Sequence, residues 1–385
     1  MSFIPYSRQN IDADDVAAVV AVLQSDFLTQ GPVGPAFEAA FAARHDVRHA
    51  IGVSNATAAL HLGCIALDIG PGSRVWTSPN SFVASANCAL YVGATVDFVD
   101  IDPVTRNMSI DALAAKLEAA ERDGTLPDLL IPVDFAGLSC DLAEMRDLAD
   151  RYGFRIMEDA SHATGASYRD RPVGSAHADI TVFSFHAVKI VTTAEGGMLT
   201  TQDDAIAHRL RLLRSHGITR SADDMERPSE GGWYYEQVML GHNCRLTDLQ
   251  SALGMSQLRH VDQWRERRDE LAARYDSLLA PLPLRLPARL PDRQSAWHLY
   301  AIEVTDAATI DRSGLFAALR AADIGVNVHY IPIHTQPHYE RLGFRRGDFP
   351  NAEHYYDHAI SIPLFPAMTR EEQDKVVDVI ARAVT

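Results

Sequence analysis

One lysine of this sequence is difficult to explain as a surface charge. Lys189 follows the apolar, β-branched run at 179–183, is flanked by Val188 and Ile190, and precedes a Gly-Gly turn at 196–197. Lysine is almost never buried unless it is paired or has a task. Burial lowers the pKa of a lysine, which makes the amine a nucleophile and a general base. We therefore predict that Lys189 is held in a pocket to form a Schiff base.

Schiff-base chemistry with pyridoxal 5′-phosphate needs three further groups. These are a carboxylate that keeps the pyridine nitrogen protonated, a cradle for the phosphate, and a flat group over the ring. Asp159 ends another predicted strand and can supply the carboxylate, although a helix N-cap explains it equally well. Thr57 and Ala58 open a helix directly after a strand, where free backbone N–H groups can bind an anion. Taken alone, that segment is more simply a helix start.

Short apolar runs and helical stretches alternate around these residues. The runs are 50–53, 74–77, 96–99, 129–133, 154–158 and 179–183, and the helical stretches between them are 56–67, 81–91, 110–120 and 142–152. This alternation indicates βαβ units and a mostly parallel sheet that helices cover on both faces. Ligands of such sheets bind at the carboxyl ends of the strands, which is where residues 54–58, 158–162 and 184–189 fall.

The two ends of the chain have a different character. Near the amino terminus, an amphipathic helix from about Asp12 carries Val16, Val19, Val20 and Leu23 on one face. From about Leu246, residues 247–275 predict one long helix, and the Pro-rich segment 280–287 begins a smaller unit. That unit has a predicted strand at 298–302 and predicted helices at 312–322 and 370–384. We predict a large domain over residues 1–245, and a linking helix with a small C-terminal domain over 246–385.

Composition narrows the classes of partner. The chain is 47% hydrophobic and 22% charged, as is typical of a globular protein in solution, and its net charge of −16 argues against nucleic acid or an anionic membrane as a partner. It has no basic segment leading into an apolar stretch and no apolar run of about 20 residues, so we expect neither a signal peptide nor a membrane span. The four cysteines form no CxxC pair. We expect reduced thiols in a cytoplasmic protein.

Several motifs together resemble the DegT/DnrJ/EryC1/StrS family of sugar aminotransferases, in the order and spacing of that family. They are TQGP (29–32), SNATAAL (54–60), FVAS (82–85), FVDID (98–102), EDASH (158–162), FSFH (183–186) through Lys189 to GG (196–197), GHNCRLTD (241–248) and HYIPIH (329–334). The likeness covers nearly the whole chain. Residues 25–32, 76–79, 85–88 and 213–220 most resemble the PseC-type branch, the UDP-4-amino-4,6-dideoxy-N-acetyl-β-L-altrosamine transaminases of pseudaminic acid synthesis.

The resemblance implies a pyridoxal phosphate-dependent aminotransferase of fold type I: an α/β protein whose large domain has a mostly parallel central sheet between helices, joined to a smaller C-terminal α/β domain. By matching position, Lys189 would bind the cofactor covalently, Asp159 would pair with the pyridine nitrogen, and His162 would lie near the phenolic edge of the ring. Phe82 would stack on the ring.

The resemblance also implies how the remaining contacts are shared. The phosphate would be bound by Thr57, Ala58 and Ser184, joined by Asn243 of the partner subunit. The expected assembly is therefore a homodimer with shared active sites. The candidates for contacting the sugar nucleotide are Tyr6, Thr29, Arg214, His216, His329 and Tyr330.

The implied reaction moves the amino group of L-glutamate to C4 of a UDP-linked 4-keto-6-deoxy-N-acetylhexosamine, UDP-2-acetamido-2,6-dideoxy-β-L-arabino-hex-4-ulose. Two alternatives stay open: another UDP- or dTDP-linked 4-keto or 3-keto sugar, and a non-catalytic regulator on the same scaffold. A dehydratase branch of the family carries histidine in place of the lysine, so Lys189 argues against that activity. A metal site at His329, His334 and His338 is disfavoured, because Pro332 and Pro337 interrupt the helix that it would need.

Overall fold

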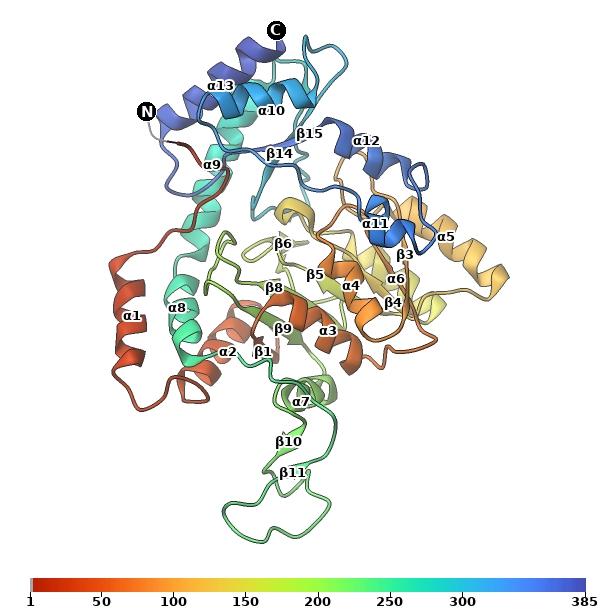
Figure 1. The fold of residues 1–385 in the computed structure, drawn as a ribbon, viewed down its shortest axis with the longest axis vertical. Helices are drawn as coiled ribbons and strands as arrows, with labels where there is room; N and C mark the ends of the chain where they lie inside the picture. Colours follow the sequence, from red (N-terminus) through yellow and green to blue (C-terminus); the bar gives the residue numbers. More distant parts are fainter. Residues whose placement is uncertain (1–2) are drawn as a thin grey trace.

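A seven-stranded sheet forms the centre of the protein, which the computed structural model describes over residues 3–385 (Figure 1). The strand order is β1-β9-β8-β5-β4-β2-β3. The strands are β1 (His49–Val53), β2 (Arg74–Thr77), β3 (Thr95–Phe98), β4 (Leu129–Ile131), β5 (Arg155–Asp159), β8 (Ile180–Ser184) and β9 (Gly197–Thr201). Only β9 runs against its neighbours among these strands, which confirms the predicted mostly parallel sheet.

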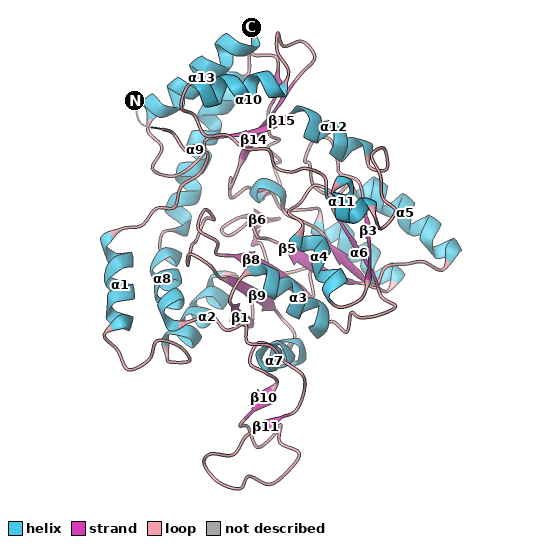
Figure 2. Cartoon of the chain, in the orientation of Figure 1, coloured by secondary structure: helices cyan, strands magenta, loops and turns pink. Residues whose placement is uncertain are grey.

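Helices cover both faces of this sheet, as its buried apolar strands require (Figure 2). One face packs against α3 (Ala56–Ala66), α4 (Ala84–Tyr91) and α7 (Asp204–Leu213). The other packs against α5 (Ile110–Asp123), α6 (Leu142–Tyr152) and α2 (Val33–Arg44). The bounds of α6 match the predicted helix, because Gly153 at φ 82° ends it in the left-handed conformation that glycine adopts without strain.

A second core lies beside the C-terminal elements. A three-stranded antiparallel sheet of β12 (Leu284–Arg285), β14 (Tyr300–Val304) and β15 (Ala359–Ile362) packs with α9 (Val261–Leu279), α10 (Arg312–Ala321) and α13 (Arg370–Val384). Ile4, from the other end of the chain, is buried in this core. The domain division at residue 246 remains a prediction.

The smaller elements are mostly connections. They are β6 (Ser167–Tyr168), β7 (Arg171–Pro172), β10 (Ile218–Thr219), β11 (Glu236–Gln237), β13 (Arg293–Gln294), α11 (Pro337–Glu340), α12 (Pro350–His358) and the 3-10 turns Phe135–Gly137 and Ile333–Thr335. The hairpin of β10 and β11 extends away from the rest of the chain, below α7 (Figure 1). Within residues 3–385, no helix has the length and apolar character that crossing a membrane requires.

The prediction of a single helix over 247–275 is wrong. The chain forms α8 (Asp248–Leu258) and then α9, with a break at Arg259 and His260. Helix α8 packs against α2 and α1 (Ala13–Leu23), whereas α9 enters the second core. Packing on two different cores therefore sets the break, in a stretch that contains neither proline nor a glycine at the bend.

The apolar face predicted for the first helix lies at the surface of the single chain. In α1, Val16, Val20 and Leu23 are 55%, 42% and 58% exposed, while Asp15 and Val22 are buried. Asp15 is buried because its carboxylate accepts hydrogen bonds from the Asp12 backbone N–H and from the Gln257 side chain.

Candidate active site

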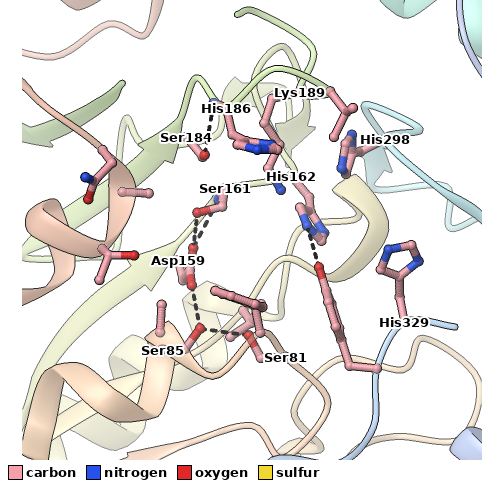
Figure 3. A pocket seen from close by; sticks show the side chains of 18 of the residues that line it. Ser81, Ser85, Asp159, Ser161, His162, Ser184, His186, Lys189, His298 and His329 are labelled. Atoms are coloured by element: carbon pink, nitrogen blue, oxygen red, sulfur yellow. Dashed lines mark hydrogen bonds between the residues drawn. The ribbon is translucent and has the colours of Figure 1, made fainter. Parts of the chain in front are cut away.

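A cavity of about 720 Å³ opens at the carboxyl ends of β4, β5 and β8 (Figure 3). This is the edge at which parallel sheets bind ligands. The predicted site residues that line it are Tyr6, Thr57, Phe82, Asp159, His162, Ser184, Lys189, His329 and Tyr330. The topology thus brings together side chains that are more than 300 residues apart in the sequence.

Lys189 lies in a turn beyond the end of β8 rather than at the end of the strand itself. Its backbone N–H donates to the His186 carbonyl at 2.9 Å, so the chain folds back there and brings the side chain to the cavity. Burial lowers the pKa of the Lys189 amine to about 8, an effect that the Asp159 carboxylate partly opposes. Near neutral pH a useful fraction of this amine is therefore uncharged and nucleophilic.

Asp159 projects from the end of β5 and is held by hydroxyl groups (Figure 3). Ser85 donates to its Oδ2 at 2.7 Å, while the hydroxyl and backbone N–H of Ser161 donate to its Oδ1 at 2.6 and 3.2 Å. Ser81 extends the network through a 2.7 Å contact with the Ser85 hydroxyl. The alternative of a helix N-cap is wrong, because turns rather than a helix follow Asp159.

The tautomer of His162 follows from its neighbours. The Ala136 backbone N–H donates to His162 Nδ1 at 3.3 Å, so this nitrogen carries no proton. Burial, with the nearby Lys189 charge, lowers the pKa of His162 well below its ordinary value. The ring is thus neutral, and its Nε2–H donates to the Tyr330 hydroxyl at 3.1 Å. Tyr330 consequently keeps its own hydrogen free for an acceptor in the cavity.

Both nitrogens of His329 are already bonded. Asn327 donates to Nε2 at 3.3 Å, which leaves the proton on Nδ1 to be donated to the Ser361 hydroxyl at 2.8 Å. Burial lowers the pKa of His329 to about 4. His329 therefore presents its neutral ring to the cavity, beside the ring of Tyr6 at 5.7 Å.

The start of α3 forms one end of the cavity and suits a phosphate. Asn55 caps this helix, and its Oδ1 accepts the Ala58 N–H at 2.8 Å, so that amide is already bonded. Thr57 lines the cavity at the positive end of the helix dipole. Gly197 lies so close that a Cβ there would be 2.8 Å from the Ala56 nitrogen. Only glycine lets β9 approach this helix end, which explains Gly197.

The other predicted residues lie outside the cavity in the single chain. Arg214 is paired with Glu38 and donates to the Gly52 carbonyl at 2.8 Å. Thr29, His216 and Asn243 are exposed. The shared site implied by the family resemblance needs a second copy of the chain, so these placements leave the roles of the four residues as proposals.

Four residues that line the cavity were not predicted from the sequence to contact a cofactor or substrate: Ser81, Ser85, Ser161 and His298. The two hydroxyls nearest Asp159 had a weak signal, because Ser161 is two residues beyond it and Ser85 lies in the FVAS motif. His298 had none, since it comes from a segment after the Pro-rich stretch. Its ring centroid lies 4.4 Å from that of His162.

The described residues contain no group of three or more histidine, cysteine or acidic side chains arranged to bind a metal ion. His334 is buried and bonds Glu353 at 2.8 Å. The residues that are present instead fit pyridoxal phosphate: an amine of lowered pKa, a carboxylate fixed by hydroxyls, a helix start that glycine leaves open, and the Phe82 ring, 59% exposed at the cavity wall.

Comparisons with known proteins agree with this chemistry. The model of the DegT/DnrJ/EryC1/StrS aminotransferase family matches residues 9–381. The spore coat polysaccharide biosynthesis protein SpsC of Bacillus subtilis is 40% identical over 382 residues, which are 98% of this chain and 96% of that protein.

Two solved structures extend the likeness to three dimensions. Helicobacter pylori PseC, an aminotransferase of pseudaminic acid biosynthesis, is 30% identical with a TM-score of 0.90, over 100% of this chain and 99% of that one. S. venezuelae DesV, solved with a ketimine intermediate, is 31% identical with a TM-score of 0.87. The match covers 99% of this chain and 98% of that one. The chain therefore belongs to the DegT/DnrJ/EryC1/StrS aminotransferase family and is a pyridoxal 5′-phosphate-dependent sugar aminotransferase with an α/β fold of type I.

Proposed function

We propose that the protein transfers the amino group of L-glutamate to C4 of a UDP-linked 4-keto-6-deoxy-N-acetylhexosamine, in pseudaminic acid biosynthesis. The supporting observation is the full-length similarity to an aminotransferase of that pathway, together with the PseC-type motifs at 25–32 and 213–220. We also propose that the reaction takes place in the cytoplasm, in line with the four free cysteines.

The cofactor contacts in this proposal follow the cavity walls. Lys189 forms the covalent link, Asp159 faces the ring nitrogen, and Phe82 stacks on the ring. The phosphate lies at the start of α3, against Thr57 and Ser184. Ala58 contributes the backbone of that helix turn, since its amide is bonded to Asn55. Asn243 of the partner subunit completes the cradle in a homodimer.

The chemistry divides between the cofactor and the chain. When bound, pyridoxal phosphate supplies an electron sink that makes the proton on the amine-bearing carbon labile. Lys189 takes that proton from the glutamate carbon and returns it at the sugar carbon, for which a pKa of about 8 is suitable. His162 holds Tyr330 so that the Tyr330 hydroxyl donates into the cavity. The closely placed rings of His162 and His298 help to exclude water.

The substrate contacts are proposed in two sets. Tyr6, His329 and Tyr330 line the cavity and face the sugar. Thr29, Arg214 and His216 lie beyond it and contact the nucleotide or the diphosphate across the subunit interface.

A second candidate function is the amination, at C4 or C3, of a different nucleotide ketosugar that is used for a surface polysaccharide. The observation that favours it is the 40% identity to a spore coat polysaccharide biosynthesis protein, which exceeds the identity to PseC. A change of sugar requires only the residues around the sugar to differ, so both candidates use the same cofactor contacts.

The two candidates separate in one assay. Purified protein is supplied with pyridoxal phosphate, 15N-labelled glutamate and a panel of UDP- and dTDP-linked 4-keto and 3-keto sugars, and the aminated carbon is assigned by mass and NMR. Label at C4 of the UDP-linked N-acetyl sugar supports the proposal. Faster labelling of another sugar, or label at C3, supports the second candidate. Absence of label in every sugar contradicts both.

A further inference from the structure

Two fully buried carboxyl groups lie behind the active site, where the chemistry described so far does not use them. Glu158 and Asp159 are consecutive in β5, so their side chains project to opposite faces of the sheet. Asp159 faces the cavity, whereas Glu158 lies within the core and is 0% exposed. Asp134, which follows β4, is also 0% exposed. Two ionised carboxylates would be very costly there without cations.

Each of these carboxyl groups has one bonded oxygen and one oxygen without a donor. Thr181 donates to Glu158 Oε2 at 2.7 Å, and the Cys140 backbone N–H donates to Asp134 Oδ1 at 2.9 Å. Glu158 Oε1 and Asp134 Oδ2 are buried and receive no hydrogen from any described residue. The backbone brings the two side chains together, since Val133 and Asp159 form a parallel bridge, and each of the two carboxyl groups affects the pKa of the other. A hydrogen bond between two carboxyl groups requires a proton on one of them.

The neighbouring groups indicate which carboxyl carries that proton. Burial, followed by the charge of Asp134, raises the pKa of Glu158 well above its ordinary value. Burial raises the pKa of Asp134 only to about 6, since the Cys140 N–H supports its charged form. The other titratable groups close enough to affect the pair are Asp159, through its charge from the opposite face of the strand, and the Cys140 thiol. Near neutral pH the favoured arrangement is neutral Glu158 donating to ionised Asp134, with one negative charge in total.

The pair is connected to two residues of the active site. The Asp134 N–H donates to the Asp159 carbonyl at 3.1 Å, which ties the end of β5 to the chain after β4. Asp134 also begins the turn that carries Ala136, and its carboxylate bonds the far side of that turn at Cys140. Ala136 in turn fixes the tautomer of His162.

We propose that Asp134 and Glu158 share one proton and act as positioning residues, holding Asp159 and the Ala136 turn in place and adding one negative charge behind the ring-nitrogen carboxylate. The charge favours every protonated group in the cavity, including the ring nitrogen that Asp159 faces. This role rests on the proposed assignment of Asp159, whereas the shared proton does not.

Glu158→Gln and Glu158→Met form a matched pair of variants. Glutamine copies a protonated glutamate, since its amide can donate to Asp134 and accept from Thr181. We expect the affinity for pyridoxal phosphate to change by less than about twofold. Methionine has a similar size but leaves Asp134 Oδ2 without a donor, so the affinity should fall by roughly tenfold. Equal losses of cofactor affinity in the two variants would contradict the proposal of a shared proton. A larger loss with glutamine than with methionine would contradict it as well.

A direct test of the proton needs no cofactor. Infrared spectra of the cofactor-free protein at neutral pH should show a protonated-carboxyl stretch that shifts in D₂O and disappears in Glu158→Gln. Absence of this band in the wild type would contradict the proposal even if the enzyme proves active.

The charge is tested with Asp134→Asn/Glu158→Gln, which keeps an amide pair but removes the negative charge. In the loaded enzyme, the pH midpoint of the visible cofactor band should move down by roughly half a unit. An unchanged midpoint would overturn the electrostatic role. A protein that shows the infrared band but never binds the cofactor would instead contradict the proposed function.

Discussion

The strand-end cavity and the segment from residue 213 to 245 carry equally specific motifs, yet they differ in how complete they are in one chain. In the cavity, Asp159 has three donors and His162 has both ring nitrogens engaged. In the segment, Trp233 and Leu240 are 73% and 82% exposed, and His216 and Asn243 face outward. The cavity is therefore positioned by its own fold, whereas the segment exposes large apolar side chains of the kind that the proposed homodimer would cover.

This contrast predicts that two cavity variants cannot rescue each other in a mixture, whereas a segment variant can be rescued by a copy whose cavity is changed instead.

The largest effect is expected for Lys189→Ala. Because the variant has neither the covalent anchor nor the base, the visible band of the lysine-bound cofactor should disappear and turnover should fall by about 10⁴-fold or more. Absorption spectra and initial rates measure both changes. Retention of the band would show that the anchor is elsewhere.

Asp159→Ala should have the next largest effect. The loss of the carboxylate that faces the ring nitrogen is expected to lower turnover by about 10²- to 10³-fold, with weaker cofactor binding. Ser85→Ala is the matched control: it removes one of the three donors to Asp159 and should cost about tenfold or less. Comparable losses in the two variants would contradict the central role of the carboxylate.

The capture of cofactor by the cofactor-free protein should depend on pH in a way that reports the Lys189 pKa. Only the neutral amine attacks the aldehyde, so the rate should rise about tenfold per pH unit and level off near pH 8. A lysine with the ordinary pKa of 10.5 would give a rate that continues to rise above pH 9. Stopped-flow absorbance distinguishes the two curves.

The smallest expected effect is the recovery of activity in mixtures of two variants, which is also the most specific test of the segment from residue 213 to 245. Asn243→Ala and Lys189→Ala are each expected to be poorly active, but an equal mixture that exchanges subunits should recover about one quarter of the wild-type sites, because half of the dimers are mixed and each has one intact site. A mixture of Asp159→Ala with Lys189→Ala is the matched control: both changes lie in the same cavity of one chain, so neither cavity of a mixed dimer is intact and no activity beyond that of the separate variants should be recovered.

These mixtures have distinct outcomes. Recovery with Asn243→Ala and Lys189→Ala, but not with the control pair, would show that Asn243 serves the site of the other subunit. If Asn243 acted within its own chain, neither mixture would contain an intact site, and absence of recovery in both would contradict the shared site. The double variant Asn243→Ala/Lys189→Ala mixed with wild type gives a further test. If the sites are shared, both sites of a mixed dimer should be inactive. If each site belongs to one chain, only one of them should be.

Much of the fold could be predicted because local signals and the sheet agree. The helix expected at 370–384 forms as α13, which Thr369 caps through its hydroxyl. The helix break at Arg259 and His260 could not be predicted, since packing on two cores decides it. The outward apolar face of α1 was unpredictable for a similar reason: periodicity shows that a face exists but not what covers it.

The site residues, like the elements of the fold, include some that the sequence predicts and some that depend on packing. Asp159 and Lys189 could be found because strand ends in a parallel sheet gather at one edge. The donation of Ser85 to Asp159 depends on how α4 packs against the end of β5, and the contact of His298 with His162 depends on the C-terminal segment returning to the cavity. Neither packing arrangement has a local signature.

The anchor itself can be tested chemically, because the chain has only three lysines, Lys116, Lys189 and Lys375. Lys116 is paired with Asp97 at 2.6 Å, and Lys375 lies in α13. The protein is loaded with pyridoxal phosphate, reduced with borohydride, digested and mapped by mass spectrometry. We predict that the reduced adduct is found on the Lys189 peptide at close to one per chain. An adduct confined to Lys116 or Lys375, or no adduct on Lys189, would contradict the account.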